Sequence, residues 1–142
     1  MSNDATPELL AEWTDGVAVV RVGKNQVSHD TRDALYAFVD ELARTGGPHK
    51  VILDLSGVKV LNSSAIGVLI NFQKRVRDVR GALKICCVDP FVLDLFRLTK
   101  MDQVLDLADS RDDAIAAYQG KARPVAPEGG KAGLFSRFFG AK

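Results

Sequence analysis

The first apolar positions of the chain form two short runs, residues 9–13 and 17–22, with Thr14-Asp15-Gly16 between them. An Asp-Gly pair between two such runs is typical of a β-hairpin, because glycine tolerates the positive φ angle of a tight turn. The sequence therefore predicts that the chain begins with two antiparallel strands.

Two longer segments have apolar residues at spacings of three and four, the pattern of amphipathic helices. We expect Asp30 to cap the first helix and residues 46–48, Gly-Gly-Pro, to end it. The second helix is expected to follow residues 62–65 and to stop at Gly81. The apolar positions of the two helices are Ala34, Leu35, Phe38, Val39, Leu42, Ile66, Leu69, Phe72, Val76 and Val79.

Between and after these helices, residues 51–55, 83–88 and 104–107 are predicted strands. The first has apolar residues on both faces, as expected for the centre of a sheet that helices cover. Short helices are expected after Asp89-Pro90 and after Asp109-Ser110. Repeated strand–helix–strand units predict an α/β fold: a mixed sheet with an initial antiparallel hairpin, parallel strands after it, and helices packed against it.

The composition divides the chain into one domain with short extensions. We expect an N-terminal extension at residues 1–7, the folded domain at 8–119, and a linker at 120–132 that is rich in Gly, Pro, Ala and Lys. Residues 133–142 form a short basic tail, with three of the seven phenylalanines in five positions.

In a helix, the large apolar residues of this tail would share one side: Leu134, Phe135, Phe138 and Phe139. A short basic amphipathic helix can dock in a partner's groove or lie weakly in a membrane interface. Eight residues are too few for a stable isolated helix, so a frayed end or a helix folded back on the domain remains an equal alternative.

The charge and composition exclude several classes of function. With 19 basic and 18 acidic residues the formal net charge is +1, which gives no reason to expect direct binding of nucleic acid. No stretch approaches the ~20 apolar residues of a membrane span, and no export signal begins the sequence. We expect a soluble protein of the cytoplasm.

The two cysteines, Cys86 and Cys87, are neighbours. Because adjacent strand residues point to opposite faces, we expect two small hydrophobic side chains in a buried strand, and no disulfide between them that clips a distant loop. A reducing compartment suits them better than a secreted setting.

Signatures of catalysis are missing from the sequence. The only histidines, His29 and His49, have no metal-ligand spacing with the cysteines or acids, and there is no phosphate-binding loop. Ser63 and Ser64 loosely resemble a nucleophile elbow, but Gly67 is displaced and no histidine is placed as a base. We expect no enzyme activity, no metal and no cofactor.

The most informative segment is residues 51–70, in which a central strand leads to a helix that opens with hydroxyl side chains. Free backbone N–H groups and the positive end of the helix dipole would favour a phosphate on Ser63. Such a phosphate would add about −1.5 to −2 charges at one spot. Equally, Asn62 and the serines can serve only as helix caps.

This segment resembles the core of the STAS domain, the fold of bacterial anti-sigma factor antagonists. Residues 54–58, Asp-Leu-Ser-Gly-Val, and residues 62–67, Asn-Ser-Ser-Ala-Ile-Gly, are similar to the family's Asp-Leu-Ser-x-Val and Asp-Ser-Ser-Gly-Leu-Gly. The resemblance continues through residues 83–85 and 91–99 and covers about residues 8–119. It implies a STAS-like sheet and a role in protein interaction.

The resemblance also implies a mechanism. In that family the unphosphorylated antagonist binds a GHKL-type serine kinase that acts as an anti-sigma factor, and the kinase then phosphorylates the serine after the aspartate. That serine corresponds to Ser63, with Ser64 as the second choice. The implied partner-binding residues are Asn25, Asn62, Ser63, Ser64 and Ile66. The sequence departs from the family at Asn62, which replaces the usual acid, and at residues 65–66.

Other functions remain open. STAS domains also serve as accessory subunits of transporters or of other signalling complexes, without a phosphorylation switch. A small-ligand or nucleotide sensor would use the loops near Asn25 and Asn62, and a hydrolase would use Ser63 as its nucleophile.

Overall fold

The structure is a computed structural model that describes residues 7–46 and 48–120. Its strands are β1 (Leu9–Thr14), β2 (Val17–Val22), β3 (His49–Asp54), β4 (Gly81–Cys86) and β5 (Leu107–Ala108). Its α-helices are α1 (His29–Thr45), α2 (Ser63–Asp78), α3 (Pro90–Leu98) and α4 (Arg111–Tyr118), and a 3₁₀ helix covers Met101–Gln103.

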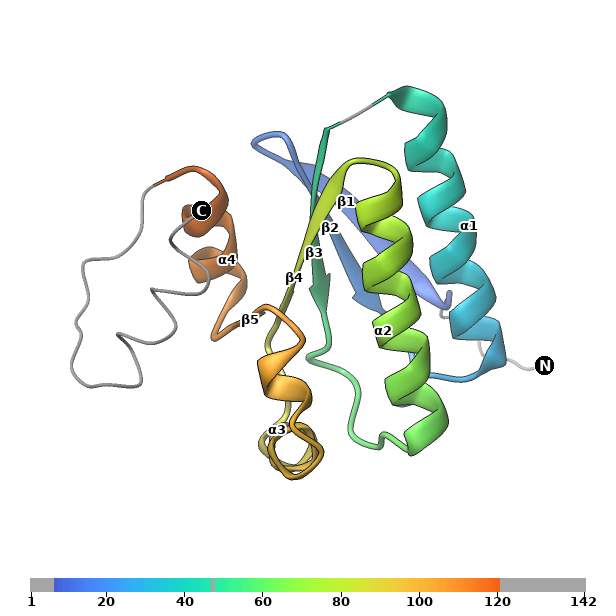
Figure 1. Cartoon of the computed structure of the whole chain (residues 1–142), viewed down its shortest axis with the longest axis vertical. Helices are drawn as coiled ribbons and strands as arrows, with labels where there is room; N and C mark the ends of the chain where they lie inside the picture. Colours follow the sequence, from blue (N-terminus) through green and yellow to red (C-terminus); the bar gives the residue numbers. More distant parts are fainter. Residues whose placement is uncertain (1–6, 47, 121–142) are drawn as a thin grey trace.

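The five strands form one sheet in the order β1-β2-β3-β4-β5, antiparallel between β1 and β2 and parallel elsewhere. Helices α1 and α2 cover one face and α4 packs on the other (Figure 1). At the hairpin, Asp15 and Gly16 have φ angles of 53° and 80°, as the Asp-Gly turn predicted. The predicted α/β fold with an antiparallel start is confirmed.

The sheet carries a hydrophobic core on each face. The larger core lies under α1 and α2 and includes Leu53 and Phe72, which are fully buried. The smaller core lies under α4 and includes Ile52 and Ala114. Neighbouring residues of β3 therefore face different cores, which explains why this strand is apolar on both faces.

The start of α1 differs from the prediction. Ser28 is the N-cap, and its Oγ accepts a hydrogen bond of 3.3 Å from the N–H of Thr31. In return, Thr31 Oγ1 accepts a bond of 3.1 Å from the N–H of Ser28, which completes a capping box. Asp30 lies inside the first turn, where its charge suits the positive end of the helix dipole.

The connection from α2 to β4 also corrects the sequence analysis. Helix α2 ends at Asp78, and Arg80 adopts the left-handed conformation with φ of 66°. Gly81 is the first residue of β4, and a Cβ there would lie 2.8 Å from Val76 Cγ1. Glycine is required at this position because the strand passes so close to the helix.

The last strand is shorter and later than predicted. The backbone N–H groups of Val104 and Leu105 both donate to the carbonyl of Met101, so they belong to a turn. Leu105 fills the core with 1% exposure, and the strand β5 begins only at Leu107. The apolar run at 104–107 thus reflects a buried turn as well as a strand.

The carboxyl ends of β2 and β3 and the N-terminal ends of α2 and α3 lie at the same end of the molecule (Figure 1). This end of a parallel sheet is where α/β folds place their binding sites. Between residues 7 and 120, no helix has the length and apolar character to cross a membrane. The N-terminal residues 1–6, and the linker and tail from residue 121 onward, lie outside the described residues.

Candidate functional site

The site is built on the segment between β3 and α2. Asp54 ends the strand, and its Oδ1 accepts a hydrogen bond of 2.8 Å from the N–H of Ser56. A tight turn follows, in which the N–H of Val58 donates to the carbonyl of Leu55 at 3.0 Å. Leu61 is buried and anchors the end of the loop, so the first turn of α2 has a defined position.

The first turn of α2 presents the predicted polar residues to solvent. Asn62 is the N-cap, and its Oδ1 accepts a hydrogen bond of 2.8 Å from the N–H of Ala65. Ser63 and Ser64 follow as exposed residues, whereas Ala65 is buried. Within the described part of the chain, no group is hydrogen bonded to the Ser63 hydroxyl, and the first turn holds no acidic residue. The cap is therefore Asn62, and Ser63 keeps its hydroxyl available.

The loop after β2 lies against this segment. The carbonyl of Asn25 accepts hydrogen bonds from the N–H groups of Lys59 and Val60, at 2.9 and 3.3 Å. The side chain of Asn25 is itself exposed. The bonded residues Asn25 and Lys59 are 34 positions apart in the sequence. The structure thus joins their two loops at the edge that carries Ser63.

Ile66 has a different position from the other predicted partner-binding residues. It is half-buried and packs against the large core, so only part of its side chain faces solvent. Of the five predicted residues, Asn25, Asn62, Ser63 and Ser64 are exposed at this end of the molecule. Ile66 mainly packs against the large core.

Exposed apolar side chains near this edge were missed by sequence reasoning. Phe91 and Leu98 of α3 are 70% and 80% exposed, and Val60 in the loop before α2 is 54% exposed. An ion pair of 3.3 Å between Lys59 Nζ and Asp89 Oδ1 joins this loop to the start of α3. Phe91 and Leu98 are apolar in the sequence, but only the packing shows that they face solvent.

A second polar cluster lies at the end of β3 on the α4 side. Arg111 Nη2 contacts Asp54 Oδ2 at 2.9 Å, and Arg111 Nη1 contacts Glu12 Oε2 at 2.7 Å. Burial alone would raise the pKa of Asp54, but hydrogen bonds from Ser56 and Arg111 outweigh it and hold that pKa below its usual value. The hydrogen bond to Asp54 correspondingly raises the pKa of Arg111. This cluster fastens α4 to the sheet.

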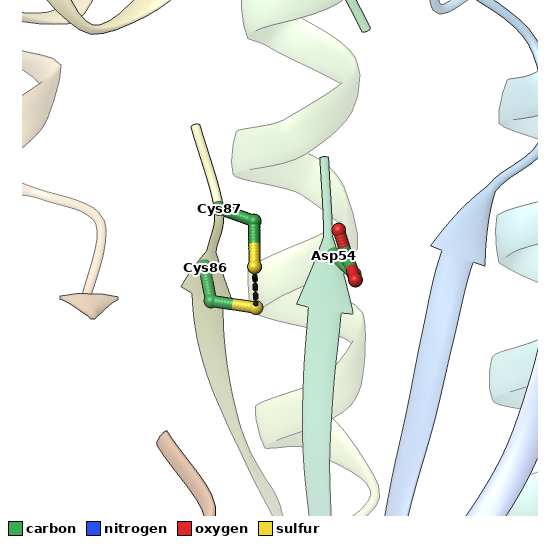
Figure 2. A group of neighbouring side chains, drawn as sticks. All are labelled: Asp54, Cys86 and Cys87. Carbon is green, nitrogen blue, oxygen red and sulfur yellow. Dashed lines mark hydrogen bonds between the residues drawn. The ribbon is translucent and has the colours of Figure 1, made fainter. Parts of the chain in front are cut away.

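Cys86 and Cys87 lie beside Asp54 and depart from the prediction of opposite faces (Figure 2). The strand ends at Cys86, and Cys87 adopts the left-handed conformation with φ of 62°. Both sulfurs therefore turn to the same side, and the Cys87 thiol donates to Cys86 Sγ at 3.1 Å. A left-handed residue other than glycine costs about 1–3 kcal/mol, so the surrounding structure must hold it.

The three side chains offer ligand atoms within 4.8 Å of one another. Both carboxylate oxygens of Asp54, however, already accept hydrogen bonds: Oδ2 from the Arg111 guanidinium and Oδ1 from the N–H of Ser56. A cation would have to displace the guanidinium or lie beside it. The arrangement is therefore a dithiol next to an ion pair.

Comparison with known proteins identifies the family. The STAS domain model matches residues 8–114, so the chain belongs to the STAS domain family. The chain is 30% identical over 73 residues to BtrV of Bordetella bronchiseptica, whose name places it among anti-sigma factor antagonists. That match covers 51% of this chain and 63% of BtrV. The chain is also 24% identical over 112 residues to the anti-sigma F factor antagonist of Paenibacillus polymyxa, and this match covers 79% of the chain and 95% of the relative.

Solved structures show the same fold. An anti-sigma factor antagonist from Mycobacterium paratuberculosis is 26% identical with a TM-score of 0.64, covering 78% of this chain and 92% of that one. SpoIIAA in its unphosphorylated form has a TM-score of 0.63 at 17% identity, covering 81% and 99% of the two chains. The phosphorylated form from Bacillus has a TM-score of 0.57 at 16% identity, covering 78% and 98%. The murine anion transporter Slc26a9 matches 76% of this chain over 18% of its own, with a TM-score of 0.56 and 18% identity.

Proposed function

We propose that this protein is a non-catalytic partner-binding module of the anti-sigma factor antagonist type, switched by phosphorylation of Ser63. The carrying observation is that Ser63 is exposed at the first position of α2, with its hydroxyl unbonded and Asn62 supplying the cap. Phosphorylation would therefore not require any existing contact of the Ser63 hydroxyl to break. Membership of the STAS family and the names of the relatives support the same function.

The physical effect of the modification is local. A phosphate on Ser63 would add about −1.5 to −2 charges beside the free N–H groups and positive dipole end of α2. It would be tolerated by the domain, because the side chain faces solvent and the first turn has no acidic residue. A partner docked on this edge would instead meet a new charge next to apolar surface, which is costly to desolvate.

The partner surface that we propose combines this turn with the neighbouring apolar side chains. Asn25, Asn62, Ser63 and Ser64 supply polar contacts, and the exposed Phe91 supplies apolar area at the same end of the molecule. Interfaces typically combine an aromatic anchor with a polar rim. The partner is an anti-sigma factor, as the names of the relatives support. The resemblance implies that this anti-sigma factor is also a serine kinase of the GHKL type.

Asn62 fits this function despite replacing the usual acid of the family. An amide oxygen caps the helix as a carboxylate does, as its 2.8 Å bond to the N–H of Ala65 shows. It does so without a negative charge beside Ser63. A phosphate at Ser63 therefore meets less repulsion from its cap than it would beside an aspartate.

The test combines phosphorylation with binding. A GHKL-type serine kinase from the source organism, incubated with ATP, should phosphorylate the wild type and Ser64→Ala but not Ser63→Ala. In calorimetry, Ser63→Ala should bind the kinase as the unmodified wild type does, and Ser63→Asp should bind at least tenfold more weakly. Equal binding by all variants, with no phosphate transfer, would remove Ser63 from the mechanism.

The alternative is a STAS accessory subunit that binds a transporter or another signalling complex without a switch. The observation behind this alternative is the fold match to part of Slc26a9. In that case a permease would copurify with the protein, and Ser63→Asp would leave the complex intact.

A further inference from the structure

The vicinal cysteines form a dithiol that the proposed switch does not use. Cys86 Sγ and Cys87 Sγ lie 3.1 Å apart, and the Cys87 thiol donates a hydrogen bond to the sulfur of Cys86 (Figure 2). The left-handed conformation of Cys87 brings the sulfurs together, because an extended backbone would place them on opposite faces. The two thiols are therefore positioned for reaction with each other.

The two thiols differ in their exposure to solvent, and this difference determines which of them reacts first with a small reagent. Cys86 is fully buried in the smaller core, and burial raises the pKa of its thiol. Cys87 is only half-buried, so a small reagent reaches it first. Thiol–disulfide exchange needs one accessible attacking sulfur and a second sulfur in line to resolve the mixed disulfide.

A metal site is less consistent with the same residues. Asp54, the third ligand that a cation would need, is held by two donors of Arg111 at 3.1 and 2.9 Å and by the Ser56 N–H at 2.8 Å. A tetrahedral zinc would also hold its sulfurs about 3.8 Å apart, from a Zn–S bond of about 2.3 Å. The observed Sγ–Sγ distance of 3.1 Å is shorter than this and lies within the about 3–3.5 Å at which reacting atoms approach each other.

We propose that Cys86 and Cys87 are a thiol–disulfide exchange site, at which a low-molecular-weight disulfide oxidises the pair to a vicinal disulfide. The Cys87 thiolate attacks one sulfur of the small disulfide, forms a mixed disulfide and releases one thiol. The Cys86 thiol then loses its proton to water and its sulfur attacks Cys87 Sγ, which releases the second thiol. The protein loses two hydrogens, and the small disulfide is reduced to two thiols.

The product is easily reversed. Adjacent Cα atoms are about 3.8 Å apart, below the usual range of about 4.4–6.8 Å for disulfide-linked residues. Strain of this kind makes a disulfide more oxidising and more readily reduced, which is the property of a regulatory pair. The site therefore suits a reducing compartment, where lasting structural disulfides are rare.

The pair is connected to the loop that leads to Ser63. The carbonyl of Cys86 accepts a hydrogen bond of 3.1 Å from the N–H of Leu55, the first residue of that loop. Two residues beyond Cys87, Asp89 forms its ion pair with Lys59 in the same loop. Closing the ring changes the backbone at residues 86–87, so oxidation should loosen the loop at residues 55–62.

The full-length protein tests this directly. Reduced protein is treated with oxidised glutathione, quenched by acid and digested with trypsin, which yields residues 85–97 as one peptide holding both cysteines. We expect that peptide to become lighter by two hydrogens and to lose reactivity with iodoacetamide. Excess reduced glutathione should restore the original mass and reactivity.

Single-cysteine variants separate the steps. Cys86→Ala should stop at a glutathione adduct on Cys87, and Cys87→Ala should react at least tenfold more slowly at the buried Cys86. The proposal is overturned if the wild type keeps both thiols, accumulates only the adduct, or forms disulfide-linked dimers. Amide hydrogen exchange at residues 55–62 gives a second readout that needs no kinase. Faster exchange in the oxidised wild type, but not in Cys87→Ala, supports the link between the cysteines and this loop. Unchanged exchange in the oxidised wild type overturns that link.

Discussion

Arg111 and Asp54 lie 57 positions apart in sequence, and the guanidinium donates two hydrogen bonds to one carboxylate oxygen of Asp54, at 3.1 and 2.9 Å. The side chain of Asp54 is 5% exposed and that of Arg111 is 36% exposed. The pair joins the first residue of α4 to the last residue of β3. It therefore supports the start of the loop that leads to Ser63.

We expect Arg111→Ala to destabilise the protein by about 1–3 kcal/mol, because it leaves the buried carboxylate of Asp54 with fewer donors. Solvent reaches the Arg111 side, which keeps the loss below that of a fully buried pair. Urea unfolding at neutral pH measures it. Arg97→Ala is the matched control, since its surface pair with Asp94 is long, at 3.6 Å, and should contribute less than about 0.5 kcal/mol.

Asp54 should also make stability depend on acid. Its pKa in the folded protein is lowered, because the hydrogen bonds from Ser56 and Arg111 outweigh the effect of burial. The resulting stabilisation is present above the unfolded pKa of about 3.9 and is lost as the pH falls through the folded value. The free energy of unfolding of the wild type should fall toward that of Asp54→Asn below about pH 4. A constant difference between the two proteins from neutral pH to acid would contradict this assignment.

The cap of α2 gives a stability prediction that is separate from the switch. Asn62→Ala should cost about 1 kcal/mol, because the N–H of Ala65 loses its side-chain acceptor. Asn62→Asp should retain most of that stability, since a carboxylate can accept the same bond. Thermal unfolding compares the two, with the exposed Ser64→Ala expected to change stability by less than about 0.5 kcal/mol. Equal losses for Asn62→Ala and Asn62→Asp would mean that the loss does not come from the hydrogen bond to the N–H of Ala65.

Phe91 and Phe96 lie on the same helix and provide a matched pair. Phe91 is 70% exposed, so Phe91→Ala should change stability by less than about 0.5 kcal/mol yet weaken binding of the partner. Phe96 is fully buried, and Phe96→Ala should cost about 3–5 kcal/mol of stability. Unfolding and calorimetry on the same preparations separate the two effects. Unchanged partner affinity in Phe91→Ala would exclude α3 from the interface.

The C-terminal tail remains a prediction, because it lies outside the described residues. Burying each of Leu134, Phe135, Phe138 and Phe139 would be worth about 1.5–3 kcal/mol, and the linker predicted at residues 120–132 would let them reach a partner or a membrane. We expect deletion of residues 133–142 to leave the melting temperature almost unchanged and to reduce association with the partner or with anionic vesicles. A drop of several degrees without any loss of binding would show that the tail packs on its own domain.

The sequence by itself determined the elements and their order. The Asp-Gly turn, the amphipathic spacing of α1 and α2 and the apolar residues on both faces of β3 are local patterns, and the structure confirms them. The start of α2 was also readable, because Asn62 followed by two serines is a local capping signal. Ser63 could therefore be chosen as a candidate before any contact was known.

Only the tertiary structure decided which distant groups meet. The pairing of Asp54 with Arg111 and the contact of Asn25 with the loop before α2 depend on how the strands and helices pack. Exposure of Phe91 beside burial of Phe96 was likewise set by the placement of α3. Alternation along a strand predicted that Cys86 and Cys87 point to opposite faces. The strand instead ends at Cys86, and the left-handed backbone of Cys87 brings the two sulfurs together. Local patterns specify helices and strands, whereas long-range contacts arise from the packing of the whole domain.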